Sequence, residues 1–74
     1  MKTYAKWDDC AVIADEVLKV ARKAVLCRFG EYDEVWLPLS QIDSSDLEEG
    51  VIQAHILMPF WLAEKHGLEE FIQD

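Results

Sequence analysis

AVLCRFGEYDEVWLPL, which runs from Ala24 to Leu39, is the stretch that decides the predicted fold. Its first six residues form a short β-prone run, residues 30–33 are typical of a turn, and a second β-prone run begins at Glu34. The two runs predict an antiparallel hairpin. Because Pro38 has no amide proton to give to a strand ladder, the second strand is expected to end near it or to run along a sheet edge.

The residues that follow predict a third strand and a closing helix. Apolar and polar residues alternate from Val51 to Met58, which is the period of a half-buried strand. The expected inward face of this strand consists of Ile52, Ala54, Ile56 and Met58, and the expected outward face of Gln53 and His55. Pro59 suits a first helical position and Gly67 a helix terminus, so residues 60–66 are expected to be helical and residues 68–72 to dock a final turn. Residues 43–50 have capping-box spacing and predict at most one helical turn.

The residues before the hairpin allow two interpretations. Apolar residues recur at steps of three and four from Cys10 to Ala24, and neither Gly nor Pro interrupts them, which predicts a helix over Asp9 to Arg22. The alternative is a hairpin in which residues 17–21 and 24–29 pair across Arg22-Lys23, although that turn lacks the Gly, Asn or Asp that tight hairpins favour. With the helix, the predicted fold class is α+β: one domain over residues 1–74 with an N-terminal helix, a three-stranded antiparallel sheet and short C-terminal helices.

Length and composition limit the possible classes of protein. A chain of 74 residues with 51% hydrophobic and 30% charged residues builds one small core and is neither a multi-domain enzyme nor a disordered segment. The apolar run from Ile56 to Ala63 contains Pro59 and falls far short of the roughly 20 residues that span a bilayer. No apolar run follows the N-terminal lysines, so a cytoplasmic protein is expected. Cys10 and Cys27 are expected to be reduced thiols in the core.

Known catalytic and metal-binding patterns are missing from the sequence. His55 and His66 have no cysteines at ligand spacing, and residues 43–54 lack the glycine and the final glutamate of a calcium loop, so neither a metal nor another cofactor is expected. Cys10 and Cys27 lie on apolar stripes with no local base signature. The chain is therefore predicted not to be an enzyme.

Charge is the most distinctive feature of the sequence. The net charge is −8, and residues 1–28 carry +2 whereas residues 29–74 carry −10. Between Phe29 and Leu62 no base accompanies the seven acids Glu31, Asp33, Glu34, Asp43, Asp46, Glu48 and Glu49. Such a surface repels phosphate backbones and anionic membranes, so neither is an expected partner. The seven carboxylates form either an ordinary solvated surface or an array that a Lys/Arg-rich groove accepts in place of nucleic acid.

Three blocks of the sequence resemble a small family of phage and prophage proteins. The blocks are Ala21–Cys27, Glu34–Ile42 with the element Trp-Leu-Pro-Leu-Ser-Gln-Ile, and Pro59–Leu68 with Pro-Phe-Trp-Leu-Ala-Glu-Lys-His-Gly-Leu. Leu39 stands where a basic residue is common in that family, and the resemblance supplies no catalytic residues. In size, charge and implied origin the chain is also similar to anti-CRISPR proteins, several of which act as DNA mimics.

Two functions are therefore predicted. The first is a non-enzymatic phage inhibitor, monomeric or weakly dimeric in the host cytoplasm, whose seven acids occupy the basic nucleic-acid groove of a CRISPR or similar defence effector. The alternative is an accessory phage module that dimerises or binds a phage replication or recombination protein through an apolar surface containing Trp36 and Trp61. The identity of the effector, the stoichiometry and the mimicked strand form are not determined by the sequence.

Overall fold

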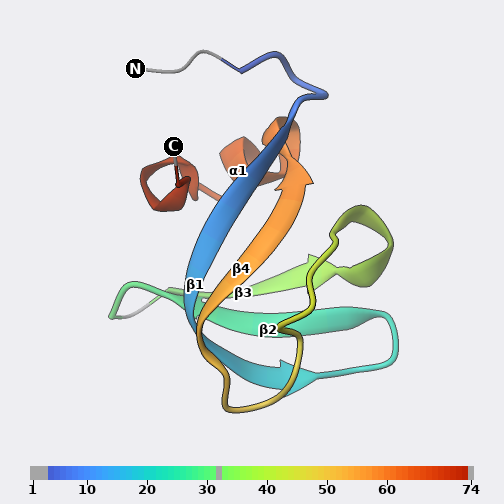
Figure 1. Cartoon of the computed structure of the whole chain (residues 1–74), viewed down its shortest axis with the longest axis vertical. Coiled ribbons are helices and arrows are strands. Elements are labelled where there is room, and N and C mark those ends of the chain that lie inside the picture. Colours follow the sequence, from blue (N-terminus) through green and yellow to red (C-terminus); the bar gives the residue numbers. More distant parts are fainter. Residues whose placement is uncertain (1–3, 32, 74) are drawn as a thin grey trace.

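The computed structural model describes residues 4–31 and 33–73 as a mostly-β domain (Figure 1). Four strands form one antiparallel sheet in the order β3-β2-β1-β4. The elements in chain order are β1 (Asp9–Val20), β2 (Ala24–Phe29), β3 (Asp33–Pro38), the 3₁₀ turn η1 (Leu39–Gln41), β4 (Ile52–Pro59), α1 (Phe60–Lys65) and the 3₁₀ turn η2 (Glu69–Phe71).

The predicted helix over Asp9 to Arg22 is wrong, and with it the α+β class with an N-terminal helix and a three-stranded sheet. These residues form β1, a 12-residue strand whose first half pairs with β4 and whose second half pairs with β2. The buried residues follow steps of two from Cys10 to Ala14 and then a step of three to Val17, and the register with β2 shifts between Val17 and Lys19. The helical pattern also used Ile13, which lies on the outward face opposite His55, so its three- and four-residue spacing combined residues from both faces of the strand. The β-branched residues of the segment favour a strand once two partners are present.

The two hairpins around β2 are local features of the chain. Val20 pairs with Val25, and the Ala21 amide donates to the Ala24 carbonyl at 2.8 Å, so the alternative hairpin across Arg22-Lys23 is confirmed. Neither turn residue has a positive φ, which explains why no Gly or Asn is needed. The predicted hairpin of residues 24–39 is also confirmed as β2 and β3, and its predicted turn residue 32 lies outside the described residues.

Strand β4 confirms the third predicted strand, with one error at its start. Ala54, Ile56 and Met58 are buried as expected, but Ile52 is 69% exposed. Gln53 has a φ of 51°, a left-handed conformation that breaks the alternation between Ile52 and the rest of the strand. Residues 43–50 form no helical turn, which lies within the predicted maximum of one, and this segment follows the edges of other strands.

The core lies between the inward face of the bent sheet and the C-terminal segment. Long β1 connects the steep β1–β4 half with the β2–β3 half, which runs across it in Figure 1. Leu62 and Ala63 of α1 and Leu68 complete this core, and η2 is tied to the sheet by a bridge between Val12 and Ile72. None of the helices formed by the described residues has the length and apolarity needed to cross a membrane.

Candidate functional site

Three of the seven predicted acids gather at the β2–β3 turn. We call Glu31, Asp33 and Glu34 the turn group, and all three are exposed. Arg28, the nearest base on the hairpin, lies between Glu16 and Glu34 in the strand register. Its guanidinium bonds to Glu16 at 3.4 Å and to the Gly30 carbonyl at 2.8 Å. It therefore moderates the local field, but its ion pair is with β1 and not with the turn group.

The other four acids lie on the long connection from β3 to β4. We call Asp43, Asp46, Glu48 and Glu49 the loop group. The Asp46 carboxylate accepts the His55 amide at 3.0 Å, and the Glu49 carboxylate accepts the Val20 amide at 3.3 Å. Asp43 exchanges two backbone hydrogen bonds of 2.8 Å with Leu57. Three members of the loop group therefore hold the connection against the sheet, a role that the sequence did not indicate.

The two groups lie on different parts of the molecule. The turn group lies at one end of the β2–β3 hairpin, at the left of Figure 1, whereas residues 43–50 descend from the other end of β3 past the sheet to the bottom of the view. Among the described residues, none of the seven acids lies within ion-pair distance of a lysine or arginine, and the one ionisable partner within that distance is His55, whose Nδ1 lies 3.8 Å from the Asp46 carboxylate. The seven carboxylates thus form no ion pair with a lysine or arginine among the described residues. They do not form one continuous surface, because they are divided between the turn group and the loop group.

The tryptophans are likewise separated. Trp36 is 47% exposed on β3, beside Leu26 of β2. Trp61 lies on α1, where its ring contacts Trp7 edge to face at a centroid distance of 6.1 Å. Trp7 is 77% exposed, and the Trp61 Nε1 is buried without a hydrogen-bond partner in the described part of the chain. Among the described residues, no ring contact joins Trp36 to Trp61, and an apolar interface that contains both stays a prediction.

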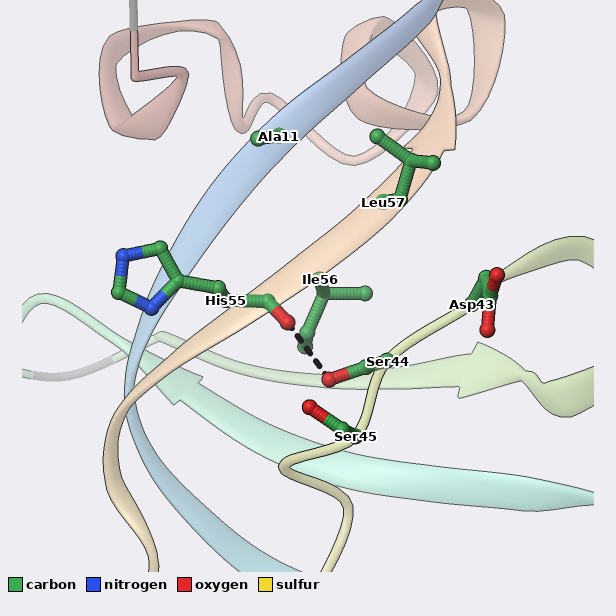
Figure 2. A pocket seen from close by; sticks show the side chains of 7 residues that line it. All are labelled: Ala11, Asp43, Ser44, Ser45, His55, Ile56 and Leu57. Carbon is green, nitrogen blue, oxygen red and sulfur yellow. Dashed lines mark hydrogen bonds between the residues drawn. The ribbon is translucent and has the colours of Figure 1, made fainter.

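An open groove of about 420 Å³ lies along the outer side of β4 (Figure 2). It is lined by Ala11, Asp43, Ser44, Ser45, His55, Ile56 and Leu57. The Ser44 hydroxyl donates to the His55 carbonyl at 2.6 Å, and its oxygen accepts the Asp46 amide at 3.0 Å. The serine is therefore bonded to backbone groups and not to the His55 imidazole, which is not the arrangement of a nucleophile and its base.

The two thiols are buried in the core. Burial raises the pKa of Cys27 to about 11, and burial together with the nearby Asp9 carboxylate raises the pKa of Cys10. Both thiols are free and are 0–2% exposed. They are therefore protonated near neutral pH, which makes them apolar packing groups.

Comparison of the chain with protein-family models, with curated proteins and with solved structures finds no match. The resemblance to phage proteins therefore stays a prediction.

Proposed function

We propose that this chain is a non-enzymatic inhibitor that occupies the basic nucleic-acid groove of a bacterial defence effector, most specifically a CRISPR complex. The observation that carries the proposal is the exposed turn group on the β2–β3 hairpin, where Glu31, Asp33 and Glu34 have no lysine or arginine within ion-pair distance among the described residues. A groove built from Lys and Arg attracts such anions by the same field that attracts phosphates.

The arrangement of charge within the domain supports a directed approach. Arg22 and Lys23 lie at one end of β2, in the turn to β1, and the turn group follows its other end. The six residues of β2 span about 20 Å, so the opposite charges are about two Debye lengths apart at physiological salt. A cationic groove is therefore attracted to the acidic end of the hairpin while the basic end is turned away.

The loop group contributes less directly to the proposed contact. Asp46 and Glu49 already accept backbone amides of β4 and β1, so their carboxylates are partly used in holding the fold. Among the described residues, the side-chain carboxylates of Asp43 and Glu48 accept no such bond and both residues are exposed, which makes them the members of this group that are best able to serve a partner.

The test is displacement of a labelled target duplex from purified, guide-loaded CRISPR effectors. The turn variant, which is expected to lose activity, carries Glu31→Lys, Asp33→Lys and Glu34→Lys. Its matched control carries Glu64→Lys, Glu69→Lys and Glu70→Lys, three exposed acids on α1 and η2, so both variants change the net charge equally. We expect wild type and the control to displace the duplex, and the turn variant to require at least about tenfold more protein.

Two results would contradict the proposal. One is displacement by the turn variant that equals displacement by wild type. The other is a wild-type protein that leaves the duplex bound throughout a panel of effectors. Displacement that weakens as salt is raised from 50 to 300 mM is a further expected outcome, because Coulomb attraction between exposed groups is screened.

The exposed tryptophans favour a second candidate function, an accessory phage module that binds a protein through an apolar surface. The specific observation is the 47% exposure of Trp36 in a strand, where a large aromatic side chain is usually covered. Sedimentation velocity at micromolar concentration separates the candidates. A salt-insensitive homodimer that Trp36→Ala dissociates would support the second function.

A further inference from the structure

The edges of the sheet differ in whether another segment of the chain forms hydrogen bonds with them. At β4, Asp43 bonds to Leu57 through two backbone hydrogen bonds, while Ser44 and Asp46 bond to His55. At the second half of β1, Gly50 and Val51 bond to Val17. The connection from β3 to β4 therefore covers these edges, which protects their backbone groups from other chains.

In the described part of the chain, no segment covers the outer edge of β3 in this way. The Leu39 amide donates to the Lys23 carbonyl at 2.9 Å, in continuation of the β2–β3 ladder. In an antiparallel pair, the backbone N–H and C=O groups of successive residues point alternately toward and away from the neighbouring strand. The backbone groups of Val35 and Leu37 therefore point toward β2, as those of Leu39 do, and the backbone groups of Glu34 and Trp36 point away from it. Within residues 4–31 and 33–73, no hydrogen bond from outside the sheet reaches Glu34 or Trp36.

Side chains on both faces of this edge offer apolar contact. Trp36 lies on the outward face next to Leu26, and Val35, which points inward, is only half-buried although its strand neighbour Leu37 is fully buried. An added strand would cover both residues while its backbone paired with Glu34 and Trp36. Pro38 has no N–H and sets the limit of this edge.

The negative charge at the start of β3 indicates which kind of segment can bind this edge. The turn group lies at the beginning of β3, so a strand added there places its side chains beside carboxylates. A second copy of this chain would bring the same acids and a net charge of −8 to that edge, which is repulsive. An extended segment in which Lys or Arg alternates with aliphatic residues instead satisfies Glu34 and packs against Trp36.

We propose that the outer edge of β3 binds an extended, Lys/Arg-rich segment of a partner protein as a fifth strand. The inference deepens the proposed function and rests on it for the cationic character of the partner. Backbone pairing with Glu34 and Trp36 supplies affinity, and the turn group supplies the preference for basic residues.

The probe is a blocked peptide of about eight residues in which arginine and valine alternate. In the free protein, the amides of Glu34 and Trp36 are expected to exchange with solvent much faster than those of Val35 and Leu37, measured by NMR. The peptide is expected to slow exchange at Glu34 and Trp36. Peptide binding without this protection would overturn the proposal, and this measurement needs no variant.

A pair of substitutions at one position separates backbone pairing from charge. Glu34→Pro removes both the carboxylate and the outward N–H, whereas Glu34→Gln removes only the charge. A proline is tolerated at an edge position whose N–H faces solvent, so both variants are expected to fold. Loss of one backbone hydrogen bond predicts about three- to tenfold weaker peptide binding for Glu34→Pro than for Glu34→Gln. Equal affinities would refute the added strand.

The outcomes also separate this inference from the proposed function. Peptide protection of Glu34 and Trp36 without displacement of duplex from any effector would support the edge site and contradict the inhibitor. Duplex displacement that depends on the turn group but is equal for Glu34→Pro and Glu34→Gln would support the inhibitor and overturn the edge site.

Discussion

The side chains of Val12 and Ile13 provide a direct test of β1, because a strand and a helix bury them differently. In the strand, Val12 is 0% exposed in the core, whereas Ile13 lies on the outward face opposite His55 and is half-buried. In a helix with its apolar face along Cys10, Ile13 and Val17, the Ile13 side chain would be buried and the Val12 side chain would be more exposed. We therefore compare Val12→Ala with Ile13→Ala, and use Val17→Ala as the control that is buried in both arrangements.

The magnitudes follow from burial. Val12→Ala removes two buried carbons, which costs about 1.6 kcal/mol at ~0.8 kcal/mol per methylene. A residual cavity of about 40 Å³ adds roughly 1 kcal/mol, so the total loss of unfolding free energy is about 2–3 kcal/mol. Ile13→Ala removes three carbons that water already reaches in part, and its expected cost is about 1 kcal/mol. The variant that deletes fewer atoms is thus expected to be the less stable one.

The measurement is urea and thermal unfolding followed by circular dichroism and tryptophan fluorescence. For a domain of this size a loss of 2–3 kcal/mol lowers Tm by roughly 10–20 °C, and a loss of 1 kcal/mol by about 4–8 °C. Val17→Ala is expected to match Val12→Ala. An Ile13→Ala variant that is as unstable as Val12→Ala, or more so, would refute the strand and its inward face.

Three further predictions concern single residues. Because both thiols are buried and the pKa of Cys27 is raised to about 11, native protein is expected to react with a thiol reagent such as DTNB much more slowly than protein in urea; equal rates would contradict the burial. Burial and Lys65 lower the pKa of His66, so the unfolded chain binds its proton first as pH falls, and stability present above pH 6.5 is expected to decline below it. The decline between pH 7.5 and 5.5 should be smaller in His66→Gln, and an unchanged difference would disprove the linkage. Gly67 has a φ of 69° with open space around it, so Gly67→Ala is expected to cost about 1 kcal/mol by strain, and Gly67→Asn less; equal stability of all three proteins would contradict this reason.

The hairpin of β2 and β3 was predictable because its signals are local. Gly30 has a φ of 74°, the conformation that a glycine in this turn permits, and Pro38 ends the strand that it was expected to end. The alternation in β4 was equally clear from Ala54 to Met58. These elements can be predicted from the apolar–polar period of the side chains and from the turn residues alone.

Strand β1 was not predictable in the same way. Its pairing with β4 joins Cys10 to Met58, far apart in sequence, and its register shift near Val17 disguises the strand period. The pattern therefore fits a helix locally, and only two partner strands decide against it.

The candidate site was predicted in part. The sequence indicated that the seven acids would face solvent, and six of them are exposed, with Asp46 half-covered where it bonds to His55. It did not indicate that Asp46 and Glu49 accept strand amides, because those contacts join residues on different elements. It also gave no means of knowing that the β4 edge is covered and the β3 edge is open.

The sequence by itself determined the charge of this protein, its β2–β3 hairpin and the alternation of its last strand, because these depend on composition and on neighbours along the chain. Only the tertiary structure decided that residues 9–20 are a strand, that the acids divide into two groups, and that Glu34 and Trp36 present a free backbone edge. Pairing between distant segments determines those features, and a local pattern carries no information on which segment is the partner.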